Sequence, residues 1–65
     1  MEQFRVDYYD ESRRVIDALT DLLGPGHESQ ILFESLTGKR PASDPVWQDF
    51  YVAAKQELNE LRRAK

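Results

Sequence analysis

His27 and Glu28 are the side chains best suited to chemistry, because a neighbouring imidazole and carboxylate can exchange a proton or contribute to a metal site. His27 is the single histidine, and the chain has no cysteine to complete a metal site or a nucleophilic pair. Adjacent residues at a helix start do not face each other. We therefore interpret His27 as an exposed turn residue and predict no catalytic, cofactor-binding or metal-binding residue.

A group of acidic residues near the N-terminus is the second candidate for chemistry. Asp7, Asp10 and Glu11 lack the glycine turn and ligand spacing of a calcium-binding loop. Negative charge is also favourable in the first turn of any helix, so capping explains them without a ligand. Helical spacing does place Asp7 and Asp10 on one stripe with Asp17 and Asp21, and this acidic stripe could contact a basic partner.

Composition limits the classes of function. The chain has 65 residues, which make one small domain that buries only about 60% of the surface exposed on unfolding. Small domains often gain stability from disulfides, a metal or a partner chain. Because this chain has no cysteine, a partner protein or self-association is the remaining source of added stability. Nine basic and twelve acidic residues give a net charge of −3, which disfavours binding to nucleic acid. The sequence has no long apolar run, so we expect no membrane span and a cytoplasmic protein.

Apolar spacing predicts an all-α, three-helix domain over residues 1–65, with helices at about 7–23, 28–37 and 45–63. The first helix carries an apolar stripe of Tyr8, Val15, Ile16, Leu19, Leu22 and Leu23. Gly24-Pro25-Gly26 ends it. The second and shorter helix has Ile31, Leu32, Phe33 and Leu36 as its apolar residues. We expect it to pack across two long helices that run roughly antiparallel.

The third helix has the clearest start, at Asp44-Pro45. An aspartate caps exposed backbone N–H groups, and a proline suits the first helical position. The helix carries a near-heptad apolar seam, and Ala53 permits close approach of another helix. The seam consists of Trp47, Phe50 or Tyr51, Ala54, Leu58 and Leu61. A helix face about 100° wide cannot bury Trp47, Phe50 and Tyr51 together, so at least one of these rings lies at its margin.

The segment before the first helix allows two interpretations. Phe4, Val6 and Tyr8 alternate with polar residues, which is the period of a strand, but they also suit a lead-in or an early helical turn. With Gly26-His27-Glu28-Ser29 opening a second helix, this order resembles a ribbon-helix-helix repressor or antitoxin. That resemblance implies a dimer whose two-stranded ribbon reads DNA. An aspartate beside Arg5 on the same face is unfavourable against phosphate, and we favour the helical lead-in.

A second resemblance covers about a third of the chain. Residues of the third helix are similar to the third-helix region of the small Hha-type modulators, which implies a protein partner. They are Ser43-Asp44, Phe50-Tyr51, Ala53-Ala54, Leu58, Glu60 and Leu61. We assign the chain to neither family.

These observations predict a small acidic, non-enzymatic interaction module. It would act as a regulator, adaptor or inhibitor by presenting a helical face to a protein partner or to a second copy of itself. A dimeric DNA-binding repressor or antitoxin is the alternative, and no small-molecule substrate or cofactor is predicted. The partner-binding residues that we expect are acids with aromatic and basic neighbours: Tyr9, Asp10, Arg13, Asp17, Asp21 and Tyr51.

Overall fold

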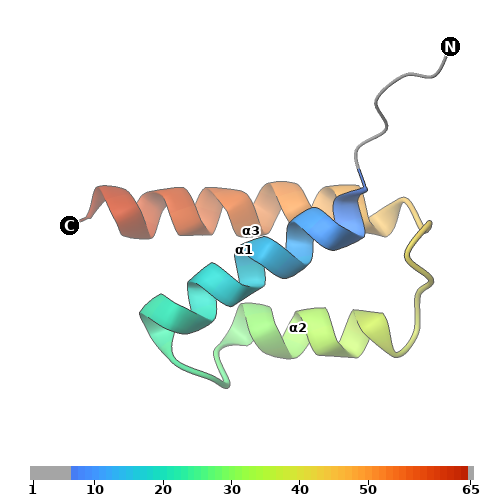
Figure 1. Ribbon diagram of the computed structural model, residues 1–65, viewed down its shortest axis with the longest axis horizontal. Helices are drawn as coiled ribbons and strands as arrows, with labels where there is room; N and C mark the ends of the chain where they lie inside the picture. Colours follow the sequence, from blue (N-terminus) through green and yellow to red (C-terminus); the bar gives the residue numbers. More distant parts are fainter. Residues whose placement is uncertain (1–6, 65) are drawn as a thin grey trace, which may run out of the picture.

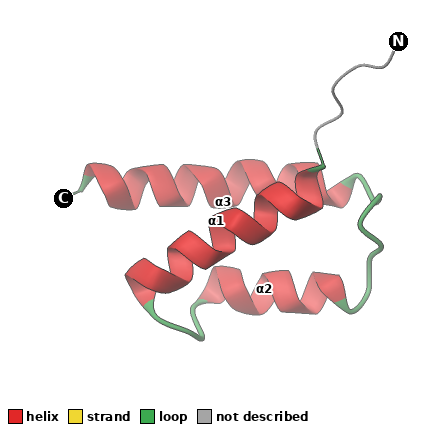
Figure 2. Ribbon diagram, in the orientation of Figure 1, coloured by secondary structure: helices red, strands yellow, loops and turns green. Residues whose placement is uncertain are grey.

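The computed structural model describes residues 7–64, which form three helices (Figure 1). Helix α1 spans Tyr8–Leu23, α2 spans Glu28–Thr37 and α3 spans Val46–Arg63. The segments between them are short loops, and no strand occurs in residues 7–64 (Figure 2). The all-α class is confirmed, and the helix bounds agree with the expected ones to within one residue.

Local hydrogen bonds explain where α1 starts and stops. The Asp7 carboxylate accepts from the backbone N–H groups of Tyr9 at 3.1 Å and Asp10 at 3.4 Å, which caps the first turn. At the other end, the Gly24 N–H donates to the Thr20 carbonyl at 2.7 Å. Gly24 and Gly26 have φ values of 86° and 90°, a region that favours glycine. The chain therefore reverses direction between Leu23 and Glu28.

Asp44 organises the start of α3 as the sequence predicts. Its carboxylate accepts from the Val46 N–H at 2.9 Å, and its carbonyl accepts from the Trp47 N–H at 3.1 Å. Pro45 already has helical angles, with φ −61° and ψ −17°. The guanidinium of Arg40, in the loop before α3, lies 3.2 Å from the Asp44 carboxylate and forms an ion pair with it. The Asp44-Pro45 junction is thus a side-chain cap followed by a proline with helical backbone angles immediately before α3.

The core lies between α1 and α3. Its buried residues come from the predicted stripes of both helices: Val15, Ile16, Leu19, Trp47, Phe50, Ala54 and Leu58. Phe33 of α2 joins this core through aromatic contacts, stacking on Tyr9 at 5.8 Å and meeting Trp47 edge-on at 5.5 Å. One aromatic cluster therefore links all three helices.

The relative direction of the long helices differs from our expectation. Tyr8 packs against Tyr51 at 5.7 Å and Tyr9 against Trp47 at 5.0 Å, so the first turns of α1 and α3 lie together. Figure 1 shows that α1 and α3 run in the same general direction, whereas α2 runs in the opposite direction. The antiparallel arrangement was wrong because α2 does not cross the long helices. It runs back alongside α3, so two chain reversals restore the original direction.

Two residues of the predicted α1 stripe, and two of the apolar residues of α2, are exposed. Leu22 and Leu23 are 45% and 44% exposed, and Ile31 and Leu32 are 59% and 51% exposed. The first pair lies in the last turn of α1, where that helix has crossed obliquely away from α3 towards the start of α2 (Figure 1). The second pair lies on α2, which has no fully buried residue. Helix α2 is therefore only partly packed against the rest of the fold.

Candidate functional site

His27 is a structural residue of the α1–α2 turn. Its Nδ1 accepts a hydrogen bond from the Gln30 N–H at 3.1 Å, so the imidazole caps α2. Its Nε2 is buried and has no hydrogen-bond partner in the described residues. The side chain is therefore half-buried and not the exposed turn residue that we expected. Both ring nitrogens are turned towards the fold, and Glu28 does not pair with the ring.

The N-terminal carboxylates are likewise explained by local structure. Asp7 caps α1, and Glu11 lies 3.7 Å from the Arg14 guanidinium one turn away. Over residues 7–64, no three side chains of the types that ligate metals converge on one point. These acids have ordinary helix-start roles.

The acidic stripe of α1 is exposed but mixed in charge. Asp10, Arg13 and Asp17 line a shallow hollow together with Arg14, and Asp21 is exposed one turn further along the helix. Two guanidinium groups therefore lie among the carboxylates of this hollow. The structure brings together three of the predicted partner-binding residues, on a face where the opposite charges offset each other.

The two predicted aromatic contact residues, Tyr9 and Tyr51, are half-buried. Tyr9 lies within the aromatic cluster of Phe33 and Trp47, and the Arg13 guanidinium lies 5.8 Å from its ring. Tyr51 packs on Tyr8 as the ring at the margin of α3, with Phe50 and Trp47 buried. Tyr9 thus contributes largely to packing of the three helices.

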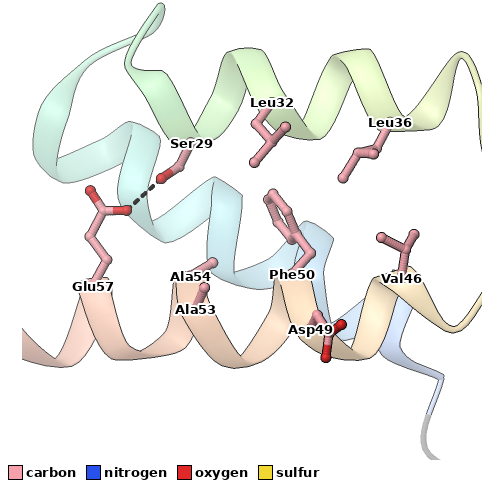
Figure 3. Close-up of a pocket in the computed structure, with 9 residues that line it drawn as sticks. All are labelled: Ser29, Leu32, Leu36, Val46, Asp49, Phe50, Ala53, Ala54 and Glu57. Atoms are coloured by element: carbon pink, nitrogen blue, oxygen red, sulfur yellow. Dashed lines mark hydrogen bonds between the residues drawn. The ribbon is translucent and has the colours of Figure 1, made fainter.

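An apolar groove lies between α2 and α3. It has a volume of about 360 Å³. Its lining residues are Ser29, Leu32 and Leu36 from α2, and Val46, Asp49, Phe50, Ala53, Ala54 and Glu57 from α3. Figure 3 shows Leu32 and Leu36 pointing across the groove towards Val46 and Phe50, with α1 behind them. We call this surface the α2–α3 groove.

The groove exists because α2 and α3 contact each other much less than α1 contacts α3. The Ser29 hydroxyl donates a hydrogen bond to a Glu57 carboxylate oxygen at one end of the groove (Figure 3). Phe33 ties α2 to the core from its other side. Between these two attachments, Leu32 is exposed opposite α3, and Leu36 is half-buried against the core.

The charged residues of the groove are all acidic. Asp49 and Glu57 line it from α3, and neither lies within salt-bridge distance of a cation in the described part of the chain. At 100° per residue, Lys55 falls on the opposite flank of the helix from Glu57. Its ammonium lies 5.7 Å from the ring centre of Tyr51. The groove thus combines an apolar surface with uncompensated negative charge.

A second hollow, of about 460 Å³, lies where the start of α1 meets the loop before α3. Its acidic residues are Asp7 and Asp44. Both carboxylates accept hydrogen bonds from helix N–H groups, and Asp44 also pairs with Arg40. Its charged groups are therefore already used in capping.

Sequence reasoning missed the groove although it named several of its lining residues, Ala53 among them. Ala53 is a small residue that permits close approach of a helix, and it is exposed on the groove wall. The pair of adjacent alanines, Ala53 and Ala54, was the feature of the sequence that could have indicated a groove on α3. The position of α2 was needed to place Leu32 and Leu36 opposite it.

Comparison with known proteins adds no relative: no protein-family model, curated protein or solved structure matches this chain. None of the helices in residues 7–64 combines the length and apolar character needed to cross a bilayer. The residues of the proposed DNA-reading ribbon, Phe4, Arg5 and Val6, lie outside the described residues, whereas Tyr8 is the first residue of α1. The ribbon interpretation therefore stays a prediction for that segment.

Proposed function

We propose that this chain is a non-enzymatic protein-interaction module that binds a macromolecular partner through the α2–α3 groove. One observation carries the proposal: Leu32 is 51% exposed and faces an open apolar wall of α3. Removing such surface from water is favourable, by about 25 cal/mol per Å². A contiguous concave apolar surface is typical of binding sites for other macromolecules.

Occupancy of the groove would be the mechanism of such a module. A bound partner covers the leucines of α2 and the α3 wall around Ala53, and it links α2 more firmly to α3. Because α2 has no fully buried residue, its packing gains most from a bound partner. Binding would therefore regulate, bridge or inhibit the partner by contact, with no chemical step.

A matched pair of substitutions on α3 tests this proposal. Ala53 and Val52 are adjacent and both exposed, but only Ala53 lines the groove. Ala53→Arg fills the groove with a long side chain, whereas Val52→Arg makes the same charge change outside it. Proteins retained by the parent chain on an affinity support are compared with those retained by each variant, and direct binding is measured by calorimetry.

We expect Ala53→Arg to weaken partner binding at least tenfold and Val52→Arg to leave it near the parent value. Asp17→Lys is included because it alters the acidic stripe of α1. Loss of binding in Asp17→Lys together with full binding in Ala53→Arg would move the site to α1 and overturn the proposal. Far-UV circular dichroism checks that each variant retains the helical fold.

A further inference from the structure

The α2–α3 groove has the shape to hold a helix. It extends along α3 from Val46 to Glu57, about 16 Å or three helical turns. Helix α1 covers one side of the α2–α3 pair, and the groove opens on the other side (Figures 1 and 3). A helix in the groove would pack against both neighbours and complete a four-helix arrangement. Helix-in-groove binding places apolar side chains at positions i, i+3 or i+4, and i+7.

The charged residues that line the groove indicate what kind of helix would bind there. Asp49 and Glu57 are eight residues apart on α3, about 12 Å along the axis. No residue three or four positions from either one is basic, so neither carboxylate has a neutralising partner on its own helix. A basic side chain of the bound helix would be attracted by these two carboxylates. The net charge of −3 on the whole chain would add to this attraction.

From this arrangement we infer that the occupant is an amphipathic helix of a partner protein, with basic residues about two turns apart flanking its apolar face. Its apolar side chains would enter between Leu32, Leu36 and Phe50, and its bases would pair with Asp49 and Glu57. This inference rests on the proposed function and specifies the chemistry of the partner at that site.

A second copy of the chain is a poorer occupant. Two copies related by a twofold axis would bring the same surface together from both sides. The acidic side chains that line the groove, Asp49 and Glu57, would then lie close to the same acidic side chains of the second copy, and like charges repel. The groove therefore favours a different, basic helix over self-association.

Synthetic helical peptides test the inference directly. Three peptides of about 14 residues share one leucine face and differ only at two flanking positions, seven residues apart, which hold lysine, glutamine or glutamate. Dissociation constants are measured with the full chain at low and high salt. Chemical shifts of the Leu32, Leu36 and Ala53 methyl groups locate the bound peptide.

We expect the lysine peptide to bind at the groove about tenfold more tightly than the glutamine peptide, which is the effect of two partly exposed ion pairs. The glutamate peptide should bind more weakly than both. The preference for lysine should shrink at high salt, because ions screen exposed pairs. Equal affinity for all three peptides would overturn the inferred charge of the partner.

Charge reversal supplies the decisive control. Asp49→Lys/Glu57→Lys should reverse the order of the peptides, so that the glutamate peptide binds most tightly. Asp10→Lys/Asp17→Lys makes the same change in net charge at a similar spacing on α1, and it should preserve the parent order. If the α1 variant reverses the order and the groove variant does not, the inference is wrong.

The remaining outcomes separate this inference from the proposed function. Failure of every peptide to shift the groove methyl groups overturns the helical occupant, whereas sensitivity of a natural partner to Ala53→Arg would still support the groove as a binding surface. A concentration-dependent dimer in light scattering that Ala53→Arg dissociates would overturn the inference in favour of a second copy.

Discussion

The indole N–H of Trp47 donates a hydrogen bond to the carbonyl oxygen of Pro41 at 2.8 Å. This contact ties the loop between α2 and α3 to the first turn of α3. The same indole ring is fully buried and contacts rings from each of the three helices. Trp47 therefore combines the largest buried apolar surface of the core with a polar anchor for a loop.

Trp47→Ala should lower the free energy of unfolding by about 3–5 kcal/mol, because it empties the centre of the core. Trp47→Phe keeps an aromatic ring but loses the bond to Pro41, whose carbonyl lies in an exposed residue. We expect a smaller loss of about 1–3 kcal/mol. Urea titrations followed by circular dichroism measure both values. A Trp47→Ala variant as stable as Trp47→Phe would contradict a role for ring packing.

Features with a local cause could be predicted from the sequence. Helix bounds follow from Asp7, Gly24 and Asp44-Pro45, whose capping and turn roles depend only on near neighbours. Core positions such as Val15 and Leu19 follow from helical spacing alone. These features require no knowledge of how the helices pack.

Features that depend on tertiary packing could not be predicted. The path of α1 across α3 leaves Leu22 and Leu23 exposed, although their spacing matches the buried stripe. The acidic stripe of α1 could be located, but its nearby arginines make it mixed in charge. The α2–α3 groove is set by the distance at which α2 stands from α3, and no local pattern encodes that distance.

Ser12→Ala should stabilise the protein. Ser12 is fully buried, and its hydroxyl has no hydrogen-bond partner in the described residues. An unpaired buried hydroxyl costs about 1–3 kcal/mol, and alanine also has the higher helix propensity. We expect a gain of about 1 kcal/mol in thermal or chemical unfolding.

Thr20→Val serves as the contrasting variant for Ser12. The Thr20 hydroxyl donates to the Ile16 carbonyl at 2.8 Å, so its removal breaks an existing bond. We expect a loss of about 0.5–1.5 kcal/mol. A loss of stability in Ser12→Ala equal to that in Thr20→Val would show that the Ser12 hydroxyl is paired.

Two glycines should respond to alanine in opposite directions. Gly26 has φ of 90°, where an alanine side chain is strained, so Gly26→Ala should lower stability by about 1–2 kcal/mol. Gly38 has φ of −82°, and an added Cβ would lie 3.7 Å from the nearest atom, the Ser35 carbonyl oxygen. Gly38→Ala should raise stability by about 0.4–1 kcal/mol, since it restricts the unfolded chain. A melting temperature below that of the parent for Gly26→Ala and above it for Gly38→Ala would confirm these predictions. A higher melting temperature for Gly26→Ala than for Gly38→Ala would refute them.

His27 tests whether the α1–α2 turn needs this histidine or only a cap. Asparagine is a better capping residue, and it supplies an acceptor for the Gln30 N–H without leaving a buried Nε2 unpaired. His27→Asn should therefore be at least as stable as the parent, whereas His27→Ala should lose about 1 kcal/mol. Hydrogen exchange at the Gln30 amide gives a local measure of the cap. Rapid exchange in His27→Ala with parent-like protection in His27→Asn is the expected pattern. Equal protection in all three proteins would mean that the imidazole does not hold the start of α2.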